Sequence, residues 1–173
     1  IEIFHNPNNF KHLSISGWVR TFRANKFIAL NDGSTIRNLQ CVIDFETIDE
    51  KVLKKIASGV ALNVEGELVK SLGKGQDYEL LVDKIKIIGE SDPELYPIQP
   101  KKHTFEFLRE KAHLRIRTST ISSVMRIRST LAFAIHDFFQ KEGFFYVNTP
   151  IITGSDAEGA GEMFRVTTLD PKN

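Results

Sequence analysis

The sequence predicts an α+β chain in which a small five-stranded β-barrel is followed by a hinge and then by mostly helical sequence. Three observations predict this fold class. The first ninety residues alternate apolar and polar side chains over five short stretches, with one helical pattern among them. Residues 91–100 contain three prolines. Residues 119–142 repeat apolar side chains at helical spacing.

Five strands are expected in the N-terminal part, over residues 13–23, 27–32, 39–44, 60–70 and 78–88. Gly17 interrupts the alternation of the first strand, which predicts a bulge or bend there. The second strand closes on the turn dipeptide Asp32-Gly33, and the last two strands are joined by the loop SLGKGQD.

A helix is expected between the third and fourth strands. Thr47 and Glu50 have the spacing of a capping box, and Gly59 stands where a helix-ending glycine would. The apolar residues on one face of this helix are Ile48, Val52 and Ile56. Three strands, a helix and two strands within residues 1–90 is the element order of an OB-fold, a barrel that leaves one face free for oligonucleotides. An SH3-like barrel is the main alternative, but it usually lacks a helix of this length.

The rest of the chain divides into a hinge over residues 91–118 and the start of a second, incomplete domain over residues 119–173. Phe105, Leu108 and Ala112 predict a short helix within the hinge. A long helix is expected over Ser119–Glu142, ended by Gly143, and an aromatic-rich strand then leads into Pro150.

Composition excludes several classes of protein. No apolar run approaches the roughly 18 residues that a membrane span needs, and no signal-peptide pattern opens the chain, so we expect a cytoplasmic protein without membrane contact. The single cysteine, Cys41, lies in the apolar alternation LQCVI and is expected to be a buried core thiol. The five histidines lack the spacing of metal ligands, so no metal site is expected within these residues.

Charge is unevenly distributed, although the net charge is only +1. Residues 101–128 contain eight Lys or Arg against two Glu, a local charge of +6, and the remainder therefore carries −5. A basic segment of this kind is typical of a nucleic-acid partner, and it is equally typical of a solvated helix with basic ends.

An RNA-binding surface is predicted on the outside of the barrel. Because Ile28 and Leu30 should point inward, Phe27 should point outward, and Gln40 faces outward by the same parity. An exposed phenylalanine stacks on an unpaired base with about 1–3 kcal/mol. A neighbouring amide reads a base edge, and basic residues of the first hairpin, Arg20, Arg23 and Lys26, bind phosphates. The alternative is that Phe27 packs against a barrel end and the basic residues are only solvated.

The stretches GWVRTFRANKFIALNDGS and LQCVI resemble the anticodon-binding barrel of the class IIb aminoacyl-tRNA synthetases, the aspartyl, asparaginyl and lysyl group. The resemblance implies that Phe27 stacks on the middle anticodon base and that Gln40 contacts it. It also implies that Glu79, in DYELLV, reads the first anticodon position and that Arg20 and Arg23 belong to the anticodon site.

A second stretch, GFFYVNTPIITGSDAEGAGEMFRV, resembles the first signature motif of class II synthetases, and its SDAEGAGEMF wording points to the asparaginyl group. In that family the long helix and the strand ending in proline build the dimer interface, which implies that Pro150 lies there. The glutamate of the E-G-A motif, here Glu158, would bind the substrate α-amino group by a charge-assisted hydrogen bond.

The resemblance thus implies an antiparallel α/β class II catalytic domain that begins within residues 119–173. It implies ligation of asparagine to tRNA(Asn) by a homodimer that uses ATP and Mg²⁺, with no DNA partner. The later ATP-binding motifs of the family are absent from these 173 residues. We therefore assign no catalytic residue within them and expect them not to aminoacylate tRNA alone. Two alternatives remain, an aspartyl-tRNA synthetase of the same class and a non-catalytic tRNA- or RNA-binding OB-fold module.

Overall fold

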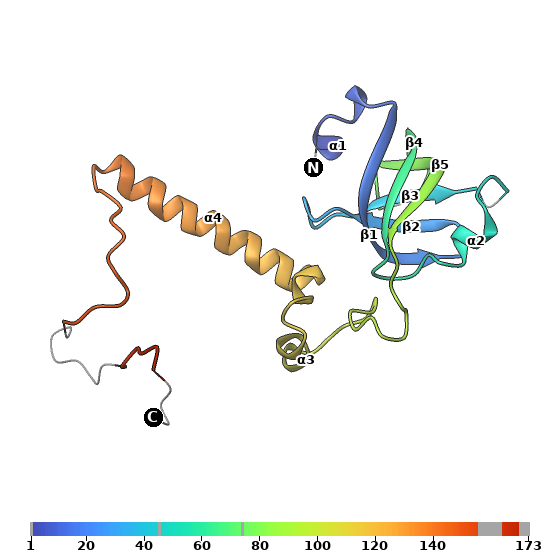
Figure 1. Ribbon diagram of the computed structural model, residues 1–173. Coiled ribbons are helices and arrows are strands. Elements are labelled where there is room, and N and C mark those ends of the chain that lie inside the picture. Colours follow the sequence, from blue (N-terminus) through green and yellow to red (C-terminus); the bar gives the residue numbers. More distant parts are fainter. Residues whose placement is uncertain (1, 45, 74, 156–163, 170–173) are drawn as a thin grey trace. The chain divides into compact units, whose positions relative to one another are not determined.

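A closed five-stranded barrel forms the N-terminal part of the molecule (Figure 1). The computed structural model describes residues 2–44, 46–73, 75–155 and 164–169. By its internal contacts the chain divides into two units, Ile1–Arg128 and Ser129–Asn173, which are described separately. The strands are β1 (His12–Arg23), β2 (Phe27–Asn31), β3 (Leu39–Ile43), β4 (Ala61–Lys70) and β5 (Tyr78–Gly89). All five predicted strands are confirmed, with ends that differ by one residue.

The order of strands around the barrel is β1-β2-β3-β5-β4. Four of the five pairings are antiparallel, and β3 pairs with β5 in parallel. This arrangement is that of an OB-fold, as the element order predicts. Every strand has two neighbours, so the barrel has no open sheet edge.

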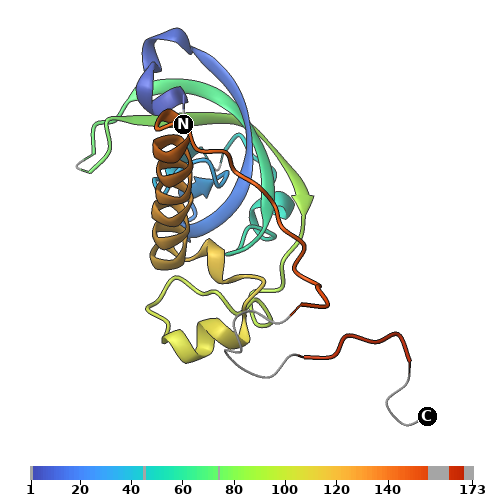
Figure 2. The same cartoon turned by 90° about the vertical axis from the view of Figure 1, so that its left-hand side faces the viewer.

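Strand β1 is long and strongly curved because it pairs with two different strands, as Figure 2 shows. Its first half pairs with β4 and its second half with β2. The predicted irregularity at Gly17 is wrong in position, because the register shifts between Val19 and Thr21. Gly17 has another role: a Cβ there would lie 2.9 Å from the carbonyl oxygen of Asn31, so a side chain would obstruct the approach of β2.

The barrel core consists of the side chains that alternate inward along the strands. Its buried members are Val19, Ile28, Leu30, Leu39, Cys41, Ile43, Ile48, Ile56, Val60, Leu62, Val64, Leu68, Leu80 and Val82. This parity confirms that Phe27 and Gln40 lie on the outer face. Cys41 is a buried core thiol, as predicted, and burial raises its pKa to about 12.

The helix between β3 and β4 is shorter than the sequence predicts. Helix α2 is a single turn, Glu50–Leu53, capped by the Asp49 carboxylate, which accepts from the backbone N–H of Lys51 at 2.8 Å. The predicted cap, Thr47, instead donates its hydroxyl to the carbonyl of Asp44 at 2.9 Å and closes an earlier turn. Gly59 has a φ of +90° but leads into β4 rather than ending a longer helix.

Two short helical segments precede the barrel and two follow it. The N-terminal pair, α1 (Glu2–His5) and the 3₁₀ turn η1 (Pro7–Asn9), was not predicted, and Ile3, Phe4 and Phe10 pack against the barrel core. In the hinge, α3 (Phe105–Glu110) is followed by the 3₁₀ turn η2 (Arg115–Arg117).

The short helix predicted in the hinge is confirmed as α3, with Thr104 at its N-cap. The Thr104 hydroxyl accepts from the backbone N–H of Phe107 at 3.3 Å. Of the three apolar residues that predicted this helix, Leu108 is buried, Phe105 is exposed and Ala112 lies beyond the helix end.

The long helix α4 spans Ser119–Lys141, within one residue of its predicted end. Gly143 has a φ of +87°, its N–H donates to the carbonyl of Gln140, and the N–H of Phe144 donates to the carbonyl of Phe139 at 3.0 Å. This is a Schellman motif, in which glycine adopts the left-handed conformation that ends a helix. No helix in the described part of the chain combines the length and the apolar content that crossing a bilayer requires.

The strand predicted between Gly143 and Pro150 is not found. Residues 144–150 have no assigned strand, and their side chains are exposed. A strand exists only where a neighbouring strand accepts and donates its backbone hydrogen bonds, and the described residues provide none beside this segment.

We predict that Gly66→Ala unfolds the barrel at much lower urea concentration than the wild type. A Cβ at Gly66 would lie 1.9 Å from the carbonyl oxygen of Leu81, where β4 and β5 shift register, so one strand must move at a cost of about 3 kcal/mol or more. The measurement is urea unfolding followed by the fluorescence of Trp18, the single tryptophan. Gly89→Ala is the control, because its Cβ would meet only the Ala61 side chain at 3.7 Å. Equal stability of the two variants would contradict the close approach.

Candidate nucleic-acid interface

The outer face of β2, β3 and β5 presents the predicted anticodon-binding residues in two adjacent rows. In one row Gln40 pairs with Ala29 on β2 and with Glu79 on β5. In the next row Val42 pairs with Phe27 and with Leu81. Residues two apart on a strand lie about 7 Å from each other on the same face. The barrel therefore places Phe27, Gln40 and Glu79 within the reach of neighbouring bases of one RNA loop.

Phe27 lies at the start of β2, directly after a tight hairpin turn. Ala24 and Asn25 both have positive φ, 51° and 50°, and the N–H of Lys26 donates to the carbonyl of Arg23 at 3.1 Å. The Lys26 ammonium lies 5.9 Å from the centre of the Phe27 ring, and Arg23 pairs with Phe27 across the hairpin. A half-exposed ring is thus bordered by two exposed cations, which suits a base and its phosphates.

Gln40 and Glu79 are joined by a hydrogen bond across the parallel pair of strands. The amide Nε2 of Gln40 donates to Oε2 of Glu79 at 3.2 Å. Because an ionised carboxylate only accepts, this bond fixes the orientation of the amide, with its nitrogen on the Glu79 side. The carbonyl oxygen of Gln40 is therefore left as an acceptor for a base N–H.

Two loop residues that the sequence did not predict, Ser71 and Gln76, also contact Glu79. The Ser71 hydroxyl donates to Oε2 of Glu79 at 2.9 Å, and Nε2 of Gln76 approaches the same oxygen at 3.4 Å. The loop is closed by the N–H of Ser71, which donates to the carbonyl of Asp77 at 3.0 Å. The only sequence signal was a polar, glycine-containing connection between two strands, which does not reveal the residue that a loop side chain contacts.

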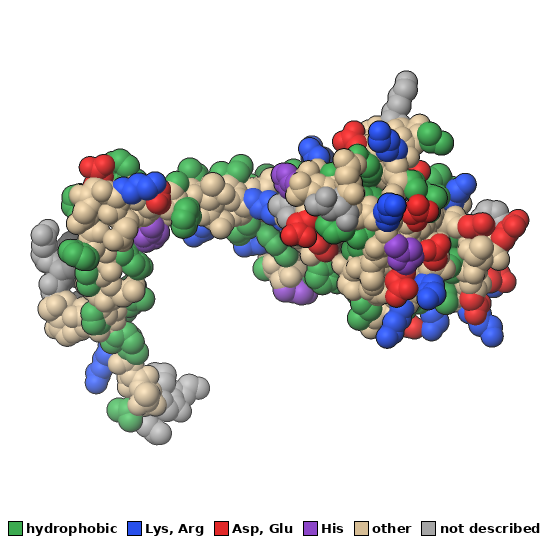
Figure 3. Space-filling view, turned by 90° about the horizontal axis from the view of Figure 1, so that it is seen from above, with side chains coloured by type: hydrophobic (Ala, Val, Ile, Leu, Met, Phe, Trp, Pro, Cys, Tyr) green, Lys and Arg blue, Asp and Glu red, His purple; other side chains and the backbone are tan. Residues whose placement is uncertain are grey.

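The charged side chains on the barrel surface are of both signs. Acidic and basic groups are interspersed over the face seen in Figure 3. Several exposed pairs neutralise each other, for example Lys55 with Glu90 at 2.6 Å and Lys84 with Glu65 at 3.7 Å. The barrel is therefore not uniformly basic, and its affinity for RNA would depend on the placement of particular groups.

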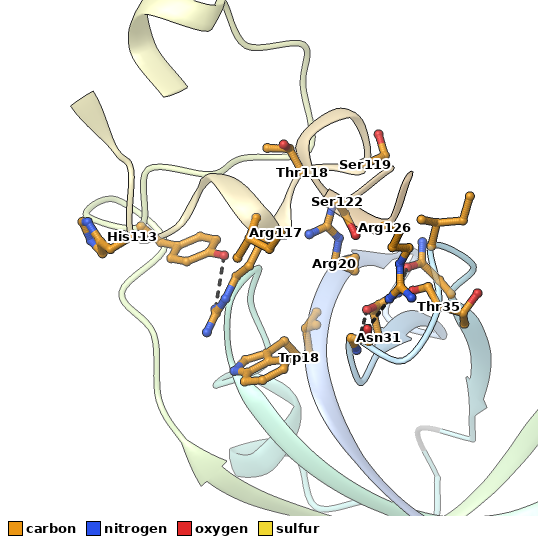
Figure 4. A pocket seen from close by; sticks show the side chains of 16 residues that line it. Trp18, Arg20, Asn31, Thr35, His113, Arg117, Thr118, Ser119, Ser122 and Arg126 are labelled. Carbon is orange, nitrogen blue, oxygen red and sulfur yellow. Dashed lines mark hydrogen bonds between the residues drawn. The ribbon is translucent and has the colours of Figure 1, made fainter. Parts of the chain in front are cut away.

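Arg20 does not join the cluster around Phe27. It lines a separate cleft of about 640 Å³, formed by β1, the β2–β3 loop, the hinge and the first turns of α4 (Figure 4). Burial lowers the pKa of the Arg20 guanidinium, and the positive charge of Arg117 lowers it further. Arg117 stacks 4.5 Å over the ring of Trp18 and also reaches the hydroxyl of Tyr96 at 3.4 Å.

Side chains that line the cleft form hydrogen bonds with neighbouring parts of the protein. Arg126, near the start of α4, donates to the carbonyls of Gly33 and, at 3.0 Å, Ser34 (Figure 4). The turn that supplies these carbonyls is organised by Asn31, which donates to the carbonyl of Arg37 at 2.9 Å and accepts from the N–H of Gly33 at 2.8 Å. No acidic side chain lines the cleft among the described residues. Arg117 and Arg126 bind the hinge and the start of α4 to the barrel.

The two predicted site residues of the C-terminal part have different outcomes. Glu158 lies outside the described residues. Pro150 is described and exposed, after a segment that has no strand partner. Among the described residues we find no group of three or more His, Cys, Asp or Glu side chains that could hold a metal ion.

Comparison with known proteins connects the two halves of the chain. The family model described as "OB-fold nucleic acid binding domain" matches residues 13–88, and the model "tRNA synthetases class II (D, K and N)" matches residues 104–172. An asparagine–tRNA ligase from Borreliella afzelii is 53% identical, and the alignment covers 97% of this chain. The chain spans only 37% of the length of that relative.

Solved structures agree with the fold. The asparaginyl-tRNA synthetase of Pyrococcus horikoshii, complexed with asparaginyl-adenylate, superposes with a TM-score of 0.75 at 26% identity, covering 87% of this chain and 36% of that one. The aspartyl-tRNA synthetase of Entamoeba histolytica has a TM-score of 0.64 at 18% identity, covering 81% and 36%. The second likeness shows the shared fold alone. Over nearly its whole length the chain is therefore similar to part of the asparagine–tRNA ligases, and residues 104–172 match the class II tRNA synthetases of the D, K and N group.

Proposed function

We propose that this chain is the tRNA-binding portion of an enzyme that ligates asparagine to tRNA(Asn), and that its barrel binds the anticodon. The observation that carries the proposal is the Gln40–Glu79 hydrogen bond beside Phe27 on the outer face of an OB-fold barrel. Half of the chain's residues are identical to those of an asparagine–tRNA ligase, which supports asparagine as the amino acid.

In this proposal each residue of the outer face has a distinct task. Phe27 stacks on the middle anticodon base, and Gln40 accepts from that base through the carbonyl oxygen that Glu79 leaves available. Glu79 accepts from the base at the first anticodon position. Arg23 and Lys26, next to the ring, bind the phosphates of the same loop.

The cleft around Arg20 is the other surface with which RNA could engage. We favour the outer face because two of the three cleft arginines are already occupied, Arg117 by Trp18 and Tyr96 and Arg126 by two carbonyls. Phe27, by contrast, has no such partner within the described part of the chain beyond the loose contact with Lys26.

The amino-acid side of the reaction involves Glu158, which we propose binds the α-amino group of asparagine. ATP is the activating substrate and Mg²⁺ its counter-ion, and we propose that both bind to the part of the relatives' length that this chain does not span. Activation by in-line attack on the α-phosphate depends mainly on positioning and electrostatic stabilisation. We place the enzyme in the cytoplasm, together with its tRNA.

The two alternatives are less favoured. An aspartyl-tRNA synthetase would share the barrel and hinge, but the aspartyl structure compared above is 18% identical over the superposed residues, against 26% for the asparaginyl structure, and the relative that is 53% identical is an asparagine–tRNA ligase. A non-catalytic RNA-binding module would not account for the match of residues 104–172 to the synthetase family.

We further propose that the enzyme is a homodimer and that one face of α4, with Pro150 nearby in sequence, lies in the interface. Five apolar side chains recur along this face, and each is more than half exposed: Val124, Ile127, Leu131, Ile135 and Phe138. A row of exposed apolar residues of this length is uncommon on a soluble monomer and suits a symmetric contact with a second copy.

Phe27→Ala should weaken binding of the chain to a tRNA(Asn) transcript by about 1–3 kcal/mol, because the variant removes the stacking surface for one base. The measurement is a binding titration at fixed salt, since phosphate contacts make the affinity depend on salt. Arg117→Ala, in the separate cleft, is the control and should leave the affinity unchanged. If Arg117→Ala alone lost affinity for the tRNA, the RNA interface would lie in the cleft instead.

Leu131→Glu should convert a dimer of the 173-residue chain into a monomer, because it places a charge in the middle of the apolar face of α4. Light scattering at micromolar concentration measures the mass. Ser129→Glu, on the opposite side of the same helix, is the matched control and should remain dimeric. A monomeric wild type would remove the support for this interface.

A further inference from the structure

The cleft beside the hinge contains one arginine that has no acidic partner among the described residues. All residues that line this cleft belong to the first unit of the chain, Ile1–Arg128. Its volume of about 640 Å³ is typical of small-molecule sites, which occupy about 300–1,000 Å³. Arg117 and Arg126 have partners within the chain. The guanidinium of Arg20, in contrast, forms neither a hydrogen bond nor an ion pair in the described part of the chain.

A β-bulge sets the position of this arginine. The register of β1 with β2 shifts between Val19 and Thr21, which leaves Arg20 as the extra residue. Val19 and Phe22 both pack against the barrel core, although regular alternation would put them on opposite faces. The Ser58 hydroxyl donates to the carbonyl of Arg20 at 3.3 Å and fixes the backbone there. Bulges of this kind re-aim a side chain and recur next to functional sites.

The positive charge of Arg20 is not balanced by its surroundings. Burial lowers its pKa, and the positive charge of Arg117 lowers it further, so the cleft disfavours this cation. Arg20 also lines a neighbouring cavity, to which Lys101 and Lys102 add positive charge. The acidic residue of that cavity, Glu106, pairs with a different arginine. An anion that enters the cleft would therefore gain a charge-assisted hydrogen bond from a half-buried donor.

The other walls of the cleft carry apolar surface and hydroxyl groups. Trp18, Ile36 and Ile116 are exposed large apolar side chains, and all three line this cleft. Ser119 and Ser122 lie on its α4 side, and neither hydroxyl has a hydrogen-bond partner among the described residues (Figure 4). The cleft thus offers a cation and two hydroxyl donors to an anionic group, and apolar surface to an organic one.

We propose that this cleft is a second binding site and that its ligand is a small organic phosphate. Arg20 binds the phosphate in the bidentate geometry that a guanidinium favours, and Trp18 and Ile116 contact the organic part. A phosphate group has three acceptor oxygens, so it can bind Arg20 on β1 together with Ser119 and Ser122 on α4. The site lies apart from the outer face proposed to bind the anticodon and does not depend on that proposal.

The experiment titrates the 173-residue chain with AMP, adenosine and inorganic phosphate, followed by calorimetry and by the fluorescence of Trp18, the single tryptophan. AMP should bind about tenfold more tightly than adenosine or phosphate, because it alone contacts both parts of the cleft. Arg20→Gln should weaken AMP binding by about 10–100-fold, the range for a hydrogen bond to a charged group, and leave adenosine binding unchanged. Arg128→Gln removes the same charge from α4 outside the cleft and should keep the wild-type affinity.

Ser122→Ala provides a second variant, because alanine is well tolerated within a helix. It removes one neutral donor and should weaken AMP binding by about threefold. Unfolding curves in urea show whether both variants remain folded.

Three results would overturn the proposal. The first is equal affinity for AMP and adenosine, and the second is AMP binding that neither Arg20→Gln nor Ser122→Ala weakens. The third concerns RNA, whose backbone carries the same phosphate chemistry: a uridine hexamer that binds through Arg20 while AMP does not would make this a site for RNA and not for a small molecule. None of these results bears on the anticodon proposal, which the tRNA affinity of Phe27→Ala tests separately.

Discussion

The parallel pairing of β3 with β5 determines both the closure of the barrel and the layout of its outer face. It closes the barrel, because β5 is the strand that links β3 to β4. It also sets Gln40 directly opposite Glu79, although 39 residues separate them in sequence. Parallel neighbours require a long connection, and here β4 and its flanking loops provide it. A shift of this register by one residue would turn one of the two side chains into the core.

The same register divides the strand side chains between core and surface. Ile28, Cys41 and Leu80 fill the barrel, and alternate positions carry the polar and aromatic groups outward. Close packing of the interior therefore fixes the geometry of the outer face, because no strand can slide without displacing its buried residues. The function proposed for this face needs a rigid platform, since a stacking ring and an acceptor oxygen discriminate among bases only while their separation is constant.

Much of this could be predicted from the sequence, for identifiable reasons. The alternation of apolar and polar residues along the strands was enough to predict that Phe27 and Gln40 lie on the surface, because their neighbours Ile28 and Cys41 must be buried. The extent of α2 was mispredicted because Thr47 and Asp49 can both cap a helix. Which of them caps α2 depends on whether the Thr47 hydroxyl is already bonded to the carbonyl of Asp44, as it is here. The contacts of Ser71 and Gln76 depend on the path of a loop, which no periodic pattern encodes. The missing strand after Gly143 shows a similar limit, since strand formation requires a partner.

We propose above that the outer face of β2, β3 and β5 binds the anticodon loop, and RNA binding can be located on the barrel residue by residue. The most direct measurement is an NMR titration of the ¹⁵N-labelled 173-residue chain with the anticodon stem-loop of tRNA(Asn). We expect that the backbone amides of Phe27, Gln40, Glu79 and the Ser71–Gln76 loop shift together at the lowest RNA concentrations. Shifts that instead cluster at Trp18, Arg117 and Arg126 would contradict it, because they would place the RNA in the cleft beside the hinge.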